Sequence, residues 1–163
     1  MDALEAIRRR RSVRDYTGDP IPREDLEAII DAGRLAASGH NVQPWEFIVV
    51  TDPEMIQQLK VAAEWMDKAG AIVAVVMDST ACWWREDGPA AVQNMLVAAT
   101  ALGYGSCWLQ GNTMPLEEEF KELLRVPEDR RLMTLVALGV PVGWPTKEKK
   151  SLDEVIHWER YSR

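Results

Sequence analysis

The chain has 163 residues and a net charge of -7 at neutral pH, with 47% hydrophobic and 28% charged residues. This length predicts a single domain, residues 1–163, that buries a core of its own. The composition is typical of a soluble globular protein. The acidic balance, with a pI near 4.9, argues against nucleic acid as a partner because it would repel a phosphate backbone. The longest apolar run, residues 69–77, is too short to span a bilayer, so we expect no membrane partner.

The two cysteines, Cys82 and Cys107, form no CxxC pair and have no histidine nearby. Their placement predicts neither a disulfide framework nor a zinc site, and we expect no metal ion. The arginines at 8–11 interrupt the apolar stretch that an N-terminal signal peptide would need. We therefore expect a cytoplasmic protein in which both thiols are structural.

The first part of the chain predicts two helices. Asp2 and Glu5 have the spacing of a capping box, which predicts a helix running into the arginines. Leu26, Ile29 and Ile30 then follow the i, i+3, i+4 pattern of a second, amphipathic helix.

Apolar strands and amphipathic helices alternate after this point. The expected strands are residues 47–50, 71–77, 106–109 and 132–138. The expected helices begin at the Asp52–Pro53 cap, at Pro89 and at Leu116, and Gly103 ends the second of them. The alternation by itself favours a doubly wound α/β sheet covered by helices on both faces.

A cluster of arginines stands out against the acidic average. Four consecutive arginines, residues 8–11, are followed by Ser12 and Arg14. Guanidinium groups bind phosphate oxygens bidentately and keep their charge at any relevant pH. The cluster therefore indicates a local site for a phosphorylated ligand, whereas a solvated helix face is the usual explanation of a charge run alone.

Two further segments carry residues suited to a ligand site. Residues 38–45 (SGHNVQPW) form a small, amide-rich turn before an apolar run, which is either a ligand wall or simply a turn leading into a strand. Trp45 is assigned to the core. The Gly103–Gly105 pair follows a helix and does not open one, so it is no dinucleotide fingerprint. Gln110 and Gly111 come after the next strand, where a backbone N–H could approach a ligand closely.

Five blocks in order resemble the nitroreductase family of FMN-dependent oxidoreductases. They are residues 10–14 (RRSVR), 38–45 (SGHNVQPW), 87–96 (DGPAAVQNML), 102–108 (LGYGSCW) and 151–158 (SLDEVIHW). The resemblance covers essentially the whole chain. It implies an α+β fold, a mixed sheet flanked by helices, in an intertwined homodimer with FMN at the subunit interface.

The resemblance also implies the cofactor contacts. The matching residues are Arg10, Ser12, Arg14, Ser38, Asn41, Gln110, Gly111 and Lys149. The first three match contacts to the phosphate and ribityl chain, and Lys149 matches a basic residue near the phosphate. Ser38 and Asn41 match contacts supplied by the partner subunit. Gln110 and Gly111 match the place where a backbone N–H faces flavin N5.

Some positions depart from the family pattern. Lys149 stands where arginine is common, with Lys147 as an alternative, and residues 62–68 offer only Lys68 for a flavin contact. The segment that forms the lid over the substrate site in this family would be short here and would contain Trp83 and Trp84. These two residues and His40 are the candidates for contact with the substrate, and packing of the tryptophans against the partner subunit is the alternative.

The implied chemistry takes place on the flavin and requires no catalytic side chain. NADH or NADPH reduces FMN, and an electrophilic acceptor such as a nitroaromatic or a quinone then takes the reducing equivalents in a ping-pong cycle. The sequence leaves open the choice between NADH and NADPH and the physiological acceptor. One alternative function is a non-catalytic flavin-binding or redox-sensing protein of the same fold. Another is a flavin-free protein that binds an anionic partner through its arginines.

Overall fold

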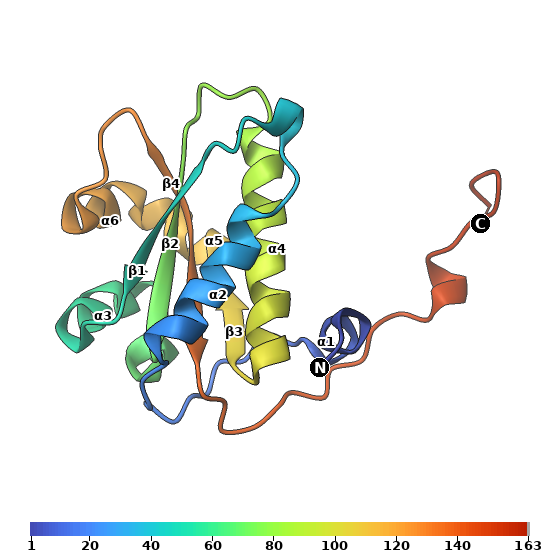
Figure 1. Ribbon diagram of the computed structural model, residues 1–163, viewed down its shortest axis with the longest axis horizontal. Helices are drawn as coiled ribbons and strands as arrows, with labels where there is room; N and C mark the ends of the chain where they lie inside the picture. Colours follow the sequence, from blue (N-terminus) through green and yellow to red (C-terminus); the bar gives the residue numbers. More distant parts are fainter. Residues whose placement is uncertain (163) are drawn as a thin grey trace.

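The structure is a computed structural model that describes residues 1–162, and its centre is a four-stranded sheet between two layers of helices (Figure 1). The strands are β1 (Trp45–Val50), β2 (Ala71–Met77), β3 (Gly105–Trp108) and β4 (Arg131–Gly139), in the spatial order β1-β2-β4-β3. All three ladders are antiparallel, and parallel pairing among the described residues is limited to the bridge between Ser12 and Ser106.

This architecture confirms the α+β class and corrects the doubly wound arrangement favoured by the pattern alone. Apolar runs show that a strand is buried on both faces, but they carry no information about strand direction. β2 illustrates the point, because all seven of its residues are buried and both of its neighbours are antiparallel to it.

The helices follow the predicted order. They are α1 (Ala3–Arg9), α2 (Arg23–Arg34), α3 (Pro53–Leu59), α4 (Trp84–Leu102), α5 (Gln110–Thr113) and α6 (Glu117–Leu124). Short 3-10 turns are η1 (Gly39–Asn41), η2 (Lys60–Ala62), η3 (Glu64–Lys68), η4 (Met114–Leu116) and η5 (Leu152–Glu154). The predicted starts of the helices at Asp2 and at Asp52 are confirmed. Asp2 accepts the Glu5 N–H at 2.9 Å, and Asp52 accepts the Glu54 N–H at 3.0 Å.

The sheet separates two hydrophobic clusters. On one face, α2 and α4 contribute Leu26, Ile29 and Met95, and on the other, α3 and α6 contribute Leu59 and Phe120. Successive residues of β2 alternate between the clusters, as the twofold period of a strand requires. Each large side chain buried in this way contributes about 1.5–3 kcal/mol.

Two predicted elements differ from the structure. The long helix does not begin at Pro89 but at Trp84, so Pro89 lies inside α4. A proline there removes one backbone hydrogen bond near the start of the helix, and the other turns are unaffected. Of residues 47–50, expected to form a buried strand, Val50 is buried, Phe47 and Ile48 are half-buried and Val49 is 40% exposed, because β1 is an edge strand. At the other end of α4, Gly103 has φ 94° and ends the helix as predicted.

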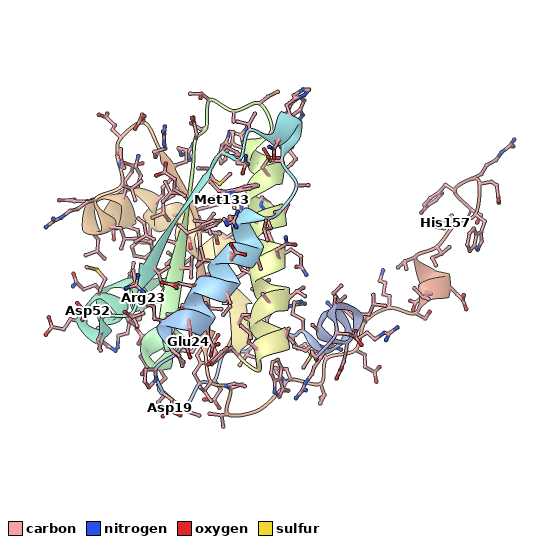
Figure 2. The ribbon with its side chains drawn as sticks, viewed as in Figure 1. Asp19, Arg23, Glu24, Asp52, Met133 and His157 are labelled. Carbon is pink, nitrogen blue, oxygen red and sulfur yellow. The ribbon has the colours of Figure 1, made fainter. Side chains whose placement is uncertain are left out.

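The C-terminal segment, residues 141–162, runs past α1 and away from the body of the molecule (Figure 1). Figure 2 shows His157 far out on this segment. Large apolar side chains are exposed along it, namely Leu152, Val155, Ile156, Trp158 and Tyr161. Within residues 1–162, no helix combines the length and the apolar character that crossing a membrane would require.

Candidate anion and cofactor site

Basic side chains from the two ends of the chain line one pocket of about 470 Å³. Its lining consists of Arg10, Arg11, Ser12, Arg14, Asp15, Pro145, Lys147 and Lys149. Five cationic side chains therefore surround one carboxylate in a chain whose net charge is negative. Guanidinium, ammonium and hydroxyl donors together suit a phosphate group. We call this cavity the anion pocket.

The segment after α1 is shaped by its pairing with β3. The Val13 N–H donates to the Ser106 carbonyl at 2.9 Å, and Val13 is buried. A Cβ at Gly105 would lie 2.8 Å from Val13, so this close approach requires glycine. Because side chains alternate along an extended chain, burying Val13 sends Ser12 and Arg14 the other way.

Arg14 lies over an aromatic ring and near a buried thiol. Its guanidinium carbon lies 5.9 Å from the centre of the Trp65 ring, within cation–π range. Burial raises the pKa of the Cys107 thiol, while the nearby charge of Arg14 opposes that rise. The thiol is therefore protonated at neutral pH, which suits the structural role predicted for it and not a nucleophilic one.

A second group of polar atoms lies at the start of α5, immediately after β3. Gln110 and Gly111 open this helix, and a Cβ at Gly111 would meet nothing within 4 Å. The Asn112 side chain donates to the Ala62 carbonyl at 2.7 Å. Ala62 ends η2, three residues before Trp65. The segment from Ala62 to Trp65 thus links the anion pocket to the open backbone at Gly111.

The structure brings Arg10, Ser12, Arg14 and Lys149 together, and their roles as phosphate contacts remain a prediction. Lys147, considered as an alternative to Lys149, lines the same pocket as well. The two lysines are two residues apart in an extended tail, and side chains with this spacing point to the same side. Their spacing therefore predicts that they reach the same site.

Sequence reasoning missed three residues of this region, Arg11, Trp65 and Asn112. Arg11 was hidden inside the arginine run, where pattern cannot separate one neighbour from the next. Trp65 falls in the segment that matched no family contact, and Lys68, the residue considered there, is exposed. The contacts of Trp65 and Asn112 depend on tertiary structure alone.

Ser38 and Asn41 lie at the opposite end of α4 from the anion pocket. The Gly39 N–H donates to the Asp87 side chain at 3.0 Å in the first turn of α4, whereas Val13 pairs with β3, which follows the last turn (Figure 1). A helix of 19 residues is about 28 Å long. Within one chain, the two groups therefore lie at opposite ends of this helix.

The loop around η1 is strained and firmly held. His40, Asn41 and Gln43 all have positive φ, at 49°, 57° and 54°. Such conformations cost about 1–3 kcal/mol each for ordinary residues, and less for Asn and His. The Ser38 hydroxyl accepts the Gln43 N–H at 3.0 Å, and this bond adds to that of Gly39. Strain that is maintained in this way is common at functional sites.

The two tryptophans before α4 have different surroundings. Trp83 is 43% exposed, and its ring lies 5.2 Å from that of His40. A Cβ at residue 39 would overlap the Trp83 ring, so the ring rests directly on Gly39. Trp84 is half-buried between the guanidinium groups of Arg85 and Arg131. Of the three candidates for contact with the substrate, Trp83 and His40 therefore present the more exposed aromatic surface.

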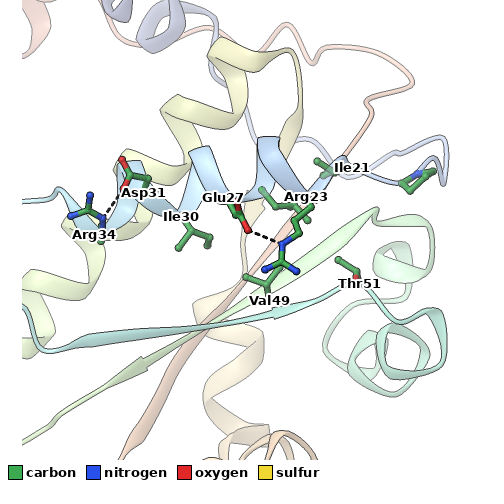
Figure 3. Close-up of a pocket in the computed structure, with 10 residues that line it drawn as sticks. Ile21, Arg23, Glu27, Ile30, Asp31, Arg34, Val49 and Thr51 are labelled. Carbon is green, nitrogen blue, oxygen red and sulfur yellow. Dashed lines mark hydrogen bonds and ion pairs between the residues drawn. The ribbon is translucent and has the colours of Figure 1, made fainter.

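Another cavity, of about 760 Å³, is a groove between α2 and the edge strand β1 (Figure 3). Its apolar residues are Ile21, Leu26, Ile30 and Val49. Its arginines are already paired, Arg23 with Glu27 at 2.7 Å and Arg34 with Asp31 at 2.6 Å. The groove therefore suits an apolar occupant and not an anion. Within residues 1–162, no group of three His, Cys, Asp or Glu side chains is arranged to hold a metal ion.

Comparison with known proteins points to one family. The model of the nitroreductase family matches residues 7–89 and 60–144. A protein of Archaeoglobus fulgidus, provisionally named NADH dehydrogenase/NAD(P)H nitroreductase, is 39% identical over 86% of each chain. A crystal structure of the same provisional name from Bacteroides thetaiotaomicron has a TM-score of 0.90 at 30% identity, over 98% of each chain. The NADPH:FMN oxidoreductase of Vibrio harveyi, in complex with NAD⁺, has a TM-score of 0.85 at 26% identity and covers 99% of this chain and 78% of that one.

Proposed function

Because the chain belongs to the nitroreductase family, we propose that it is an oxidoreductase that takes electrons from NADH or NADPH and carries them on FMN. The single observation that carries this proposal is the meeting of Arg10, Ser12 and Arg14 with Lys149, from the far end of the chain, in one pocket. The names of the relatives, NAD(P)H nitroreductase and NADPH:FMN oxidoreductase, support the same activity.

The residues present fit FMN. Arg10, Ser12, Arg14 and Lys149 would hold the phosphate in the anion pocket, because their donors match its oxygens. The open backbone at Gly111, which carries no side chain, would leave room for the ring. When bound, FMN supplies the hydride acceptor at N5. The chain supplies binding, a backbone N–H from Gln110–Gly111 toward the ring, and cationic charge near the cofactor.

The site is completed by a second copy of the chain in an intertwined homodimer. Ser38 and Asn41 lie at the opposite end of α4, a helix about 28 Å long, from the anion pocket of their own chain, and this separation supports a role for them in the pocket of the partner. The exposed apolar side chains of residues 151–161 need cover, and the groove between α2 and β1 offers an apolar floor beside an unpaired strand edge. The tail of one subunit therefore packs into the groove of the other.

The acceptor is an electrophilic aromatic molecule such as a nitroaromatic or a quinone. Trp83 and His40 present exposed rings on the same loop as Ser38 and Asn41, which the dimer brings to the flavin. Trp84, half-buried between Arg85 and Arg131, offers less aromatic surface to the acceptor than Trp83 does. Two free cysteines, Cys82 and Cys107, suit the reducing cytoplasm as the location.

An absorbance spectrum tests this proposal. The purified protein is reconstituted with FMN, and its spectrum is recorded before and after anaerobic addition of NADH or NADPH. Rapid bleaching of the bound flavin is expected, and the faster donor is the physiological class. Bound flavin that neither donor bleaches would favour a redox-sensing protein. Absence of flavin binding would overturn the assignment of the anion pocket.

A further inference from the structure

Arg11 differs from the other arginines of the anion pocket because its Nε and Nη1 groups already donate to backbone carbonyls. Its Nε–H donates to the Lys147 carbonyl at 2.8 Å, across 136 positions of sequence. Its Nη1 group donates to the carbonyls of Arg8 and Arg10, each at 2.8 Å. All three bonds go to backbone oxygens, so Arg11 joins the end of α1 to the C-terminal tail.

A neighbouring contact holds the same part of the tail. The guanidinium carbon of Arg9 lies 5.1 Å from the centre of the Trp144 ring, within cation–π range. Trp144 precedes Pro145, and Lys147 and Lys149 follow in the pocket lining. The tail is thus fixed at Trp144 and at Lys147, on either side of the turn that carries it into the anion pocket.

Electrostatics makes this attachment necessary. Five cationic side chains share the pocket with one carboxylate, that of Asp15, so the lysine-bearing tail is repelled by the arginine-bearing segment. Arg11 binds the tail through a carbonyl dipole, which leaves its own positive charge uncompensated. A phosphate between the two segments would remove the repulsion and join them.

We propose that Arg11 is a positioning residue, which sets Lys147 and Lys149 on the ligand phosphate by holding the Lys147 carbonyl. The proposal rests on the proposed function for the identity of the ligand. The proposal has a reciprocal consequence. If the ordered tail increases the affinity for phosphate, then bound phosphate must stabilise the ordered tail by the same free energy.

Four proteins and two flavins test this role. The dissociation constants of FMN and of riboflavin, which lacks the phosphate, are measured by flavin fluorescence for the unaltered chain, Arg11→Ala, Arg11→Lys and Arg8→Ala. Arg8→Ala is the matched control, because it removes an exposed charge three residues away and leaves the backbone carbonyl in place.

We expect Arg11→Ala and Arg11→Lys to weaken FMN at least tenfold and riboflavin less than threefold, while Arg8→Ala changes neither by more than threefold. Lysine keeps the charge but cannot reproduce the forked donation to three carbonyls. Full FMN affinity in Arg11→Lys would contradict the positioning role, because charge alone would then suffice. Equal weakening of FMN and riboflavin in Arg11→Ala would contradict it as well, because the defect would then be a general one.

Hydrogen exchange of residues 144–150 tests the reciprocal consequence with inorganic phosphate as an independent probe. Phosphate and FMN should both slow exchange in this segment of the unaltered chain, and riboflavin should not. In Arg11→Ala the protection by phosphate should be lost. Protection by phosphate that persists in this variant would overturn the inference. Failure of the unaltered chain to bind FMN would overturn the proposed function alone, since the phosphate experiment still tests Arg11.

Discussion

The two ends of α4 carry two parts of the proposed site that are built on different principles. At the C-terminal end, charge dominates, with arginines after α1 and lysines of the tail around the anion pocket. At the N-terminal end, backbone geometry dominates, with three non-glycine residues of positive φ held by Ser38, Asp87 and the Trp83 ring. The charged end can bind a phosphate by itself, whereas the strained end offers shape and an aromatic surface.

This difference separates affinity from selectivity. Under the proposed function, we expect charge-assisted hydrogen bonds at the anion pocket to supply a large part of the binding free energy for FMN. The strained loop adds few charges, so we expect it to determine which acceptor molecules can approach the flavin ring. Substitutions at the charged end should therefore change the affinity for FMN, and substitutions at the strained end should change the KM for the acceptor.

The largest effect is expected from removing residues 151–163. Without the tail, the groove between α2 and β1 loses its occupant, and each anion pocket loses the loop of the other subunit. We expect a monomer that binds FMN at least a hundredfold more weakly, as measured by sedimentation and flavin fluorescence. The full-length variant Asp153→Asn, altered at an exposed polar position of the tail, should behave as the unaltered chain. A truncated protein that remains a dimer with normal FMN affinity would contradict the intertwined arrangement.

Next in size is the effect of Arg14→Ala at the charged end. Loss of a charge-assisted hydrogen bond to phosphate should weaken FMN binding by about 1.5–3 kcal/mol, roughly 10- to 150-fold. Titration of flavin fluorescence measures the change, with Arg8→Ala as the control that removes the same charge outside the pocket. Unchanged affinity would remove Arg14 from the site.

A smaller and more selective effect is expected from Trp83→Ala at the strained end. Stacking on an aromatic ring contributes about 0.5–1.5 kcal/mol, so KM for a quinone should rise about 2- to 12-fold. Ferricyanide, which does not stack, serves as the control acceptor, and Trp83→Phe should retain most of the selectivity. If KM rose equally for both acceptors, Trp83 would have no part in recognising aromatic compounds.

The last effect is on stability, not on binding, and concerns the support of the strained end. Glu117 accepts two hydrogen bonds from Arg131 at 2.6 Å each, and Arg131 in turn lies over Trp84 at the start of α4. The hydrogen bond from Arg131 lowers the pKa of Glu117 below its ordinary value. A carboxyl whose pKa is lower in the folded state stabilises the fold above its unfolded pKa of about 4.3. That stability is lost as the pH falls through the lower, folded value.

We therefore expect Glu117→Gln to reduce the free energy of unfolding by about 1–2 kcal/mol at pH 7. The difference from the unaltered chain should shrink when urea denaturation is repeated near pH 3. The rise of the Tyr104 pKa to about 12, caused by its hydrogen bond to Asp25, places that group outside this window, so it does not obscure the result. A difference that is the same at both pH values would mean that the ion pair is not its source.

The charged end was largely predictable from the sequence, and the strained end was not. Arginine and lysine carry a positive charge wherever they occur, so residue type alone indicates an anion site. The helix caps at Asp2 and Asp52 and the helix end at Gly103 depend on a few adjacent residues. Local signals of this kind can be read from a single chain. The expected start at Pro89 failed because Trp83 and Asp87 extend the helix through contacts with a distant loop.

Strand direction and residue pairing have the same limit. The apolar pattern of β2 fixes its burial, yet only its pairing with β1 and β4 fixes the antiparallel order. Trp65 was missed because its position over Arg14 depends on how η3 packs, not on the sequence around it. Arg11 was missed because its partner, the Lys147 carbonyl, is a backbone atom that no side-chain pattern reveals.

Mixing two impaired variants, assayed at an FMN concentration that saturates only the unaltered protein, tests most directly whether the two ends of α4 meet across subunits. Arg14→Ala removes a side chain from the charged end of the site, and Asn41→Ala removes one from the strained end. Equal amounts of the two dimers are unfolded together and refolded. A mixed dimer has one site with both defects and one site with none. Random association should then restore activity to about a quarter of the sites, because half of the dimers are mixed. Recovery near that level is the result our account predicts. Recovery no greater than that of the separate variants would mean that the two ends never meet in one site.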